Sequence, residues 1–545
     1  MKKRPLALSA VVLAALALSA APFLPASDFS LAKPQYHLPD LPYGMSLPGQ
    51  GWRPGVAHNH THLSDSPVDP VPGSVTMPAY LNKYNALGLS WCAFTEHYPE
   101  HLGFCADPGD LLGQYNWLGS AGYLGADVDF AGIFGVELSP MDQQEYANLL
   151  ALLPIPFPPV FDGDSDRHMC CYYSHFHYPD DHVHSTLVDD DDDTAETIYK
   201  TYNFDGGFAV VNHPESIASD AAYRQKVVSL NRKVWYSPTS PRYDLTRTPF
   251  GVEIANKNWP SWSYYSCFKN FLMEGAKVFP FVGRDAHRVT DANDPSREAD
   301  DHLVVVPWTD ANGDNDIVGA LRAGRFYVSS GSGIALWACE PDESACYWMG
   351  SEIKNVPKDK KFTFKVTYHT GNNKPGERTM YRVRVIKGNT PITYRPHFQN
   401  PDFTFVKKAA EDELLFQTNP LPANTEGQLE FEVEIDDLYF PRSATPVYLP
   451  PCPYIMDGDE PYLFYYRNRP DVVSRAYCSM WVRADVQEIL DPVWIPPLFG
   501  GEGFWVNPTW TSGTPQYHAF TTPIWLLPGP DIPKIHPSAT PCPSN

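Results

Sequence analysis

The sequence predicts an α/β barrel followed by an all-β sandwich. From residue 53 to about residue 335, short apolar runs alternate with helical patterns, an order that is typical of a parallel sheet or barrel. After about residue 336 the apolar residues instead recur with period two, in runs separated by Pro and Gly, which favours antiparallel strands. With 545 residues the chain is long enough for two or three domains, and we place the barrel at 53–335 and the sandwich at 336–545.

The N-terminus resembles a secretory signal. A positive start, Lys2 to Arg4, precedes the apolar stretch Leu6 to Leu18, and small residues follow at Ser19–Ala21. The apolar stretch is shorter than the ~20 residues that a membrane span needs, and the sequence shows no second candidate span. We therefore predict a signal peptide at 1–26 and a secreted or periplasmic protein without an integral membrane segment. Residues 27–52, rich in Pro and Gly, read as an extended lead-in.

One helix–strand unit can be followed residue by residue. A helix is predicted to start at Thr76, with Pro78 tolerated in its first turn, and to stop at Gly88. The apolar run Trp91–Phe94 then predicts a strand that delivers His97 at its end. Barrel enzymes keep their chemistry on polar residues placed just past strand C-termini.

The same logic repeats later in this region. A helical stripe, Phe268 to Leu272, closes at Gly275, and the strand Val278–Val282 then delivers Asp285 and His287. A third helix is predicted at 317–323, before Gly324. The period-two runs of the sandwich are at 362–368, 381–385 and 429–435.

Charge and cysteine usage narrow the partners. The formal net charge of -23 disfavours nucleic acid and anionic membranes as partners. Ten Cys in an exported chain suggest some disulfides; Cys339 and Cys346 are close enough to close a small loop, whereas Cys170 and Cys171 lie in an apolar run and are predicted to be buried thiols. We interpret the acidic run 189–193 as a solvated loop and the acidic spacing at 310–316 as a helix-capping loop rather than a calcium site.

Six clusters of metal-type side chains follow one another between residues 58 and 287. In the first, His58 and His60 share one face if they lie on a strand, so both imidazoles can bind one ion, and Asp65 follows in a turn. For the fourth cluster, His168 competes with His175 and His177. Imidazole and carboxylate ligands without thiolates suit Zn, Mn or Fe. The full predicted ligand set is His58, His60, Asp65, His97, Glu137, His168, His213, Asp285 and His287.

These clusters resemble the motifs of the polymerase-and-histidinol-phosphatase (PHP) superfamily. The segment His58 to Asp65 matches the opening motif, His-x-His-Thr-x-x-Ser-Asp, and Thr95 to His97 resembles Thr-Asp-His with Glu in the middle. Gly135 to Glu137, His213-Pro214 and Gly283 to His287 resemble the later motifs. The stretch 320–328 is similar to the end of the barrel in secreted carbaryl-hydrolase-like metallohydrolases, which carry a C-terminal β-sandwich.

The resemblance implies a distorted seven-stranded, TIM-like (β/α) barrel that holds three divalent metal ions. By carry-over, His58, His60, Glu137 and Asp285 would hold the first ion, Asp65, His97 and His287 the second, and Glu137, His168 and His213 the third. Arg284 replaces the family's usual Ser, and would pair either with a substrate anion or with an acidic neighbour. The predicted catalytic residues are Arg284, Asp285 and His213, the last as a candidate proton donor to the leaving group, with His175 and His177 as alternatives.

Three functions follow from this pattern. The first is a secreted metal-dependent phosphoesterase, in which a metal-activated hydroxide attacks phosphorus. The second is a carboxylic-ester, carbamate or amide hydrolase at the same site. The third is a non-catalytic binding protein that keeps metals only for structure. We expect the first, with a small-molecule ester as the partner. The sequence predicts no particular oligomeric state.

Overall fold

The computed structural model describes part of the chain, and all of the described residues belong to the compact unit Tyr36–Asn545. The predicted signal peptide at 1–26 and the lead-in up to residue 50 lie outside the described residues. The described residues are 51–61, 63, 76–98, 108–124, 130–138, 168–176, 190–214, 221, 224, 227, 232–237, 240–256, 262–286, 302–307, 316–342, 344–356, 360–371, 379–391, 411–434, 478–489, 493–495, 504–506 and 516–528.

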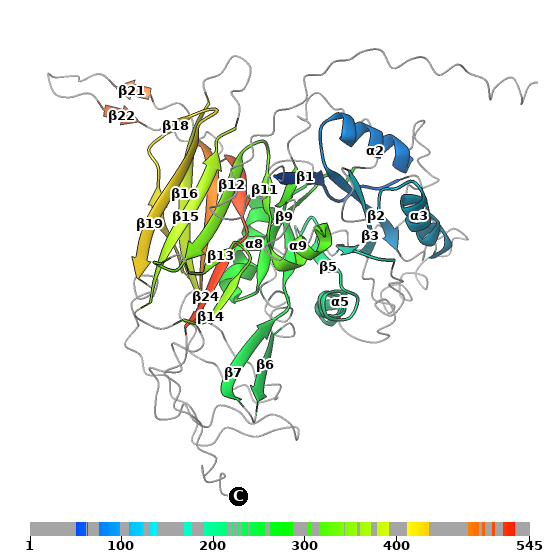
Figure 1. Cartoon of the computed structure of the whole chain (residues 1–545), viewed down its shortest axis with the longest axis horizontal. Helices are drawn as coiled ribbons and strands as arrows, with labels where there is room; N and C mark the ends of the chain where they lie inside the picture. The colour runs from blue at the N-terminus through cyan, green and yellow to red at the C-terminus, as the bar shows by residue number, and fades with distance from the viewer. Residues whose placement is uncertain are drawn as a thin grey trace, which may run out of the picture. The chain divides into compact units, whose positions relative to one another are not determined.

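One sheet of 16 strands dominates the fold (Figure 1). Its main path runs β14 (Glu352–Val356), β24 (Ile524–Pro528), β20 (Cys478–Ile489), β23 (Gln516–Thr521), β11 (Tyr327–Ser329), β10 (Leu303–Pro307), β1 (Trp52–Val56), β2 (Trp91–Tyr98), β3 (Ala131–Leu138), β4 (Met169–Tyr173), β5 (Phe208–Val211), β8 (Phe250–Asn256) and β9 (Val278–Gly283). Off this path, β16 (Met380–Pro391) pairs with β20, β17 (Glu411–Gln417) and β18 (Leu421–Pro422).

The predicted (β/α)7 TIM-like barrel is wrong. The described residues are mostly β, with 51% in strands and five helices, and they form a large curled sheet. β1, β2 and β3 run parallel, as do β5, β8 and β9, but β4 is antiparallel to both of its neighbours and β10 is antiparallel to β1. The alternation of apolar runs showed where strands begin and end, but it carries no information about strand direction. The sheet curls so that Phe279 and Phe281 of β9 pack against Phe326, next to β11, with ring centroids 5.9 and 5.8 Å apart.

Five helices accompany these strands in the described chain: α2 (Met77–Ala86), α3 (Pro108–Ser120), α5 (Asp190–Asn203), α8 (Trp262–Glu274) and α9 (Ile317–Ala323). The three helices predicted near 77, 268 and 317 are confirmed, with Thr76 as the N-cap of α2 and Gly324 left-handed at the end of α9. Asp316 caps α9 by accepting a hydrogen bond from the Val318 N–H, as the helix-capping interpretation predicts. The interpretation of 189–193 as a loop is wrong, because α5 begins at Asp190. Acidic residues are favourable in the first turn of a helix, since the N-terminal end of a helix carries a partial positive charge.

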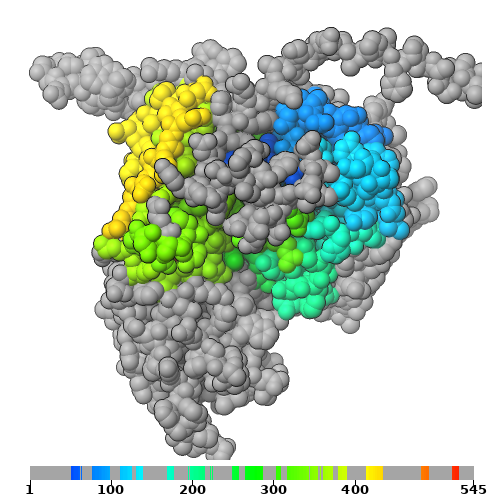
Figure 2. Space-filling view, viewed as in Figure 1, coloured from blue at the N-terminus to red at the C-terminus, as the bar shows by residue number. Residues whose placement is uncertain are grey.

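Helix α2 supports the chain segments that directly follow β1 and β9. Its buried Tyr84 donates a hydrogen bond from Oη to Asn59 Oδ1 (2.8 Å), and Tyr80 donates to the Ala286 carbonyl (2.9 Å). Asn59 and Ala286 also form a parallel bridge with each other. The helix thereby fixes the chain just beyond β1 against the chain just beyond β9. Figure 2 shows α2 and α3 at the surface of the face viewed (blue and cyan).

A second, four-stranded antiparallel sheet contains β13 (Cys346–Trp348), β12 (Gly333–Cys339), β15 (Lys361–His369) and β19 (Glu426–Glu434). The predicted small loop is closed by the Cys339–Cys346 disulfide, and Cys170 and Cys171 are buried free thiols, as predicted. The C-terminal strands β20, β23 and β24 join the large sheet, in which β23 pairs with β11. The domain boundary at 335/336 stays a prediction. Two ribbons, β6 (Arg232–Ser237) with β7 (Ser240–Arg247) and β21 (Val493–Ile495) with β22 (Phe504–Val506), complete the described strands.

A buried ion-pair network joins α8 to the C-terminal strands. The fully buried Asp485 accepts two hydrogen bonds from Arg384 (2.8 and 2.9 Å) and one from Arg483 (2.8 Å). Arg483 in turn donates to Tyr265 Oη of α8 (2.6 Å). Both guanidinium groups therefore donate to the same carboxylate.

Replacing Asp485 with Asn is expected to lower the free energy of unfolding by about 3–5 kcal/mol, because it removes the buried negative charge that faces the buried Arg483 and the half-buried Arg384. The matched control is Glu432→Gln, which breaks the exposed Lys361–Glu432 pair (2.9 Å) and is expected to cost less than about 1 kcal/mol. Urea unfolding measures both. Equal effects of the two substitutions would contradict the network.

No helix among the described residues has the length and apolar character needed to cross a bilayer.

Candidate metal centre

The predicted side chains meet at one edge of the large sheet. His58 and His60 follow β1, and His97 and Glu137 lie opposite each other near the ends of β2 and β3. His213 follows β5 and Asp285 follows β9. The C-terminal ends of parallel strands share an edge, which explains these six positions. His168 reaches the same edge by a different route: it precedes β4, and that strand runs antiparallel, so its beginning lies where its neighbours end.

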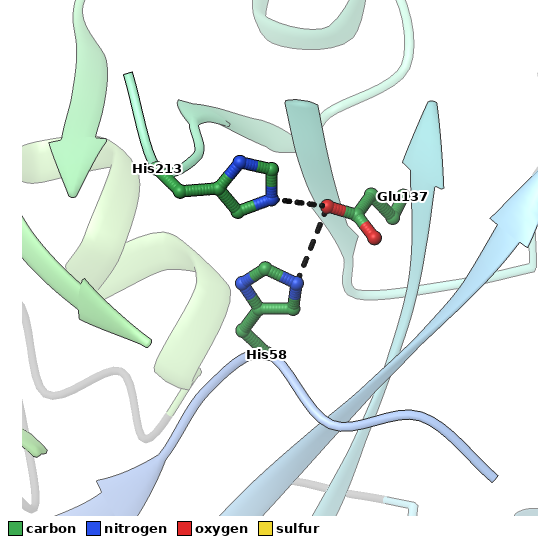
Figure 3. Close-up of side chains that lie close together, drawn as sticks. All are labelled: His58, Glu137 and His213. Carbon is green, nitrogen blue, oxygen red and sulfur yellow. Dashed lines mark ion pairs between the residues drawn. The ribbon is translucent and has the colours of Figure 1, made fainter. Parts of the chain in front are cut away.

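The carboxylate of Glu137 is the centre of the cluster. Its Oε1 lies 3.3 Å from His58 Nε2, 3.2 Å from His168 Nδ1 and 3.4 Å from His213 Nε2. Its Oε2 lies 3.2 Å from His60 Nε2 and 3.0 Å from His97 Nδ1. Figure 3 shows His58 and His213 pointing at the same oxygen. One carboxylate is thus surrounded by the nitrogens of five imidazoles.

Asp285 adds a second carboxylate. Its Oδ1 lies 3.6 Å from His58 Nε2 and 3.5 Å from His60 Nε2. Within the described residues, three groups have ligand atoms close enough to hold a metal ion, and they share members: His58, Glu137 and His213; His58, His60 and Asp285; and His60, His97 and Glu137. The residues are therefore arranged so that neighbouring ions could share ligands.

The donor atoms fit a metal ion better than they fit one another. His58 Nε2 and Glu137 Oε2 are buried, and neither has a hydrogen-bond partner within the part of the chain that the structure describes. A buried polar atom without a partner costs free energy, and a cation at this point would satisfy both atoms. Burial also raises the pKa of the neighbouring Cys170 thiol, despite an opposing effect of His58.

Charge is concentrated in this cluster. Burial by itself would raise the pKa of Glu137, but the nearby His58, His168 and His97 outweigh it and hold the pKa well below its usual value. For His58 the balance is reversed: burial acts to lower its pKa, whereas Cys170, Glu137 and Glu253 raise it well above the usual value. The pKa of His213 is also raised, because its hydrogen bond to Glu137 and the charges of Glu137 and Glu253 outweigh burial.

The backbone is strained at the same place. Four non-glycine residues in the described chain have a positive φ, and three of them are His58 (62°), His213 (23°) and Asp285 (47°). Side chains with a Cβ rarely adopt this region, and such strain clusters at functional sites. The fold therefore holds these three side chains in place against a local conformational cost.

Two polar residues that the sequence reasoning missed support the cluster from behind. Glu253 of β8, fully buried, accepts from His58 Nδ1 with Oε1 (2.7 Å), and with Oε2 from the His213 N–H (2.9 Å) and Asn256 Nδ2 (3.0 Å). Asn212 donates from Nδ2 to Glu137 Oε1 (2.8 Å). The signal for Glu253 was an acidic residue inside the apolar run Phe250–Ala255, since a buried carboxylate needs partners.

The remaining predicted residues fall into two groups. Asp65, His287 and His177 lie outside the described residues, and their roles stay predictions. Of the two described rivals, His168 lies against Glu137, whereas His175 is exposed. Arg284 is buried. Burial and the positive charge of Arg284 lower the pKa of Lys83, so the Lys83 ammonium lies near the Arg284 guanidinium. Both interpretations of Arg284 stay open.

Comparison with known proteins adds little to this geometry. No family model matches the chain, and no curated protein is detectably similar to it. Among solved structures, the chain is similar to a histidinol phosphate phosphatase from Lactococcus lactis subsp. lactis Il1403, solved in complex with Zn, L-histidinol and phosphate. The identity is 14%, the match covers 44% of this chain and 92% of that chain, and the TM-score is 0.24. A likeness at this TM-score carries no argument about fold or activity.

Proposed function

We propose that this protein is a metal-dependent hydrolase of the PHP type. The observation that carries the proposal is one buried carboxylate, Glu137, whose two oxygens lie 3.0–3.4 Å from the nitrogens of five imidazoles. The positive φ angles of three contributing residues support it, because a fold without a function for that geometry gains nothing from the strain. The sequence motifs around His58, Glu137 and Asp285 support the PHP assignment.

The roles of the residues follow from their grouping. His58, His60 and Asp285 would hold one divalent ion, His60, His97 and Glu137 a second, and His58, Glu137 and His213 a third, with His168 also against Glu137. A divalent ion at this edge would lower the pKa of water enough to supply hydroxide near neutral pH. Glu137 would hold the ligand groups together, and Arg284 would bind substrate oxygens.

We propose a phosphoester as the first substrate class, because closely spaced divalent ions and a buried arginine suit an anionic group. The carboxylic-ester, carbamate or amide alternative uses the same hydroxide. We also propose that the protein works outside the cytoplasm. The Cys339–Cys346 disulfide supports this location, since such bonds persist in oxidising compartments.

The test loads the metal-free protein with Zn, Mn or Fe(II) and compares aryl phosphate mono- and diesters with aryl esters and carbamates. We expect metal-dependent turnover of the phosphoesters, and its loss in Asp285→Ala. The matched control is His369→Gln, a buried histidine at the end of β15, which is expected to keep wild-type activity. Metal-dependent turnover of the aryl esters or carbamates alone would show that the hydroxide attacks carbon and not phosphorus. Tight metal binding without any metal-dependent turnover would favour a binding protein.

A further inference from the structure

A second cluster of reactive side chains lies among the C-terminal strands of the large sheet. Ser330 directly follows β11, His518 lies in β23, and Glu488 lies in β20. These three strands are neighbours, because β23 pairs with β11 on one side and with β20 on the other. None of the three residues belongs to the groups around Glu137.

The three side chains form a continuous chain of hydrogen bonds. Ser330 Oγ lies 3.0 Å from His518 Nδ1, and His518 Nε2 lies 2.6 Å from Glu488 Oε2. A hydroxyl within reach of an imidazole whose other nitrogen is held by a carboxylate is the arrangement that activates a serine nucleophile. With Nε2–H donated to Glu488, the Nδ1 lone pair faces the serine hydroxyl.

Local backbone features aim these side chains at one another. The register of β20 and β23 shifts between Val486↔Ala519 and Gln487↔Tyr517, so His518 is the extra residue of a β-bulge. Bulges redirect side chains and are frequent beside active sites. On the other strand, Gly331 turns the chain immediately after Ser330 with φ of 102°. The backbone N–H of Ser330 also donates to the His518 carbonyl (2.9 Å), which locks the two residues together.

Glu488 is the more buried member of the pair that it forms with His518. The Glu488 side chain is 6% exposed and that of His518 13%, and Ser330 is half-buried. A desolvated carboxylate holds an imidazole more strongly than an exposed one. The imidazole is therefore held by a buried carboxylate, and Ser330 is partly open to solvent.

Further hydroxyls lie close by. The Tyr381 ring packs edge-on against the His518 ring, with centroids 5.3 Å apart. A Cβ at Gly371 would lie 2.9 Å from Tyr381 Oη and 3.1 Å from Ser332 Oγ, so both hydroxyls face the same narrow space. Ser332 Oγ is buried and has no hydrogen-bond partner among the described residues.

We propose that Ser330, His518 and Glu488 form a second, metal-independent hydrolytic site for small carboxylic esters. Ser330 Oγ attacks the ester carbonyl carbon while His518 Nδ1 takes the hydroxyl proton. The bond from the carbonyl carbon to the leaving alkoxide then breaks, and the alkoxide receives that proton from His518. Water, deprotonated by His518, cleaves the resulting acyl-Ser330 ester to give the carboxylic acid and return the serine. Glu488 holds His518 in the required tautomer throughout.

A fluorophosphonate probe tests this proposal, because it forms a covalent adduct with activated serines only. The full-length protein is treated with chelator and then with the probe, and the modified peptide is identified by mass spectrometry. We expect one adduct, on Ser330, formed at the same rate with and without metal. We also expect slow turnover of p-nitrophenyl acetate that chelation leaves unchanged. An adduct on another residue, or none on Ser330, would overturn the proposal.

Variants separate catalysis from structural support. Ser330→Ala is expected to abolish labelling, and His518→Gln to slow it by at least about 10²-fold, the lower end of a general base's contribution. The matched control is Ser174→Ala, an exposed serine that donates to Asp316 (3.1 Å) and should leave labelling unchanged. Thermal unfolding shows whether each variant is folded. If folded His518→Gln is labelled as fast as the wild type, the imidazole does not activate Ser330 and the proposal fails.

Discussion

Replacing Glu137 with Gln is expected to abolish metal binding at the cluster and to lower metal-dependent turnover by more than about 10²-fold. Loss of a residue that only supports a metal ligand costs up to about 10²-fold, and Glu137 would itself be a ligand. The carboxylate belongs to two of the three candidate metal groups and contacts five imidazoles. Gln keeps the shape of the side chain, but it removes the negative charge and turns one oxygen into a donor. Calorimetric titration with Zn and Mn measures the binding.

Thermal unfolding gives a readout that does not depend on activity. A ligand that binds only the folded state stabilises it by about 2.7 kcal/mol at 100 times its Kd. The wild type is therefore expected to unfold at a higher temperature when metal is present, and Glu137→Gln to show no such rise. Glu432→Gln, in an exposed ion pair, should keep the full rise. Unchanged metal affinity in Glu137→Gln would show that the ions, if any, bind elsewhere.

Replacing Glu253 with Gln is expected to weaken metal binding by about 10–100-fold, although this residue belongs to none of the candidate metal groups. Both oxygens of Glu253 act as acceptors, one for His58 Nδ1 and the other for the His213 N–H and Asn256. An amide has only one oxygen, so the NH2 group of Gln must face either His58 Nδ1 or the N–H groups of His213 and Asn256. His58 or the backbone of His213 then shifts, and both residues already have a positive φ.

Gly283→Ala tests the hydrogen bond between Glu253 and His58 without changing either residue. A Cβ at Gly283 would lie 1.9 Å from Glu253 Oε1 and 2.9 Å from His58 Cβ, so the carboxylate must move away from His58. The matched control is Gly388→Ala, where the new Cβ would meet the buried Trp481 ring at 1.9 Å, away from the cluster. We expect both variants to be less stable and only Gly283→Ala to lose metal affinity. Equal metal affinities would show that Glu253 has a purely structural role.

Local features of the fold were predictable from the sequence, whereas strand direction was not. Thr76, Pro78 and Gly88 predicted α2, because caps and breakers act within one turn of the chain. The direction of β4 depends on which neighbours it pairs with, and a five-residue apolar run carries no trace of that. The sequence also did not predict that the C-terminal strands continue the same sheet, because β23 and β11 pair although they lie far apart in the sequence.

The candidate site shows the same division. His97, Glu137, His213 and Asp285 could be picked out because each follows an apolar run, and His58 and His60 because of their His-x-His spacing. The structure brings these six residues together. Choosing between His168 and His175 required the direction of β4. The Ser330–His518 contact joins residues 188 positions apart, and no local pattern marks such a pair.

The pairing of β23 with β11 has a consequence for how this protein folds. Strands β10 and β11 lie between the metal-type cluster on one side and β23 on the other, and the segment that completes their pairing comes 188 residues after Ser330. Contacts so distant along the chain must repay a large loop-closure entropy before they stabilise anything, which makes folding slow. We therefore expect the nascent chain to remain incompletely folded until β23 has been synthesised.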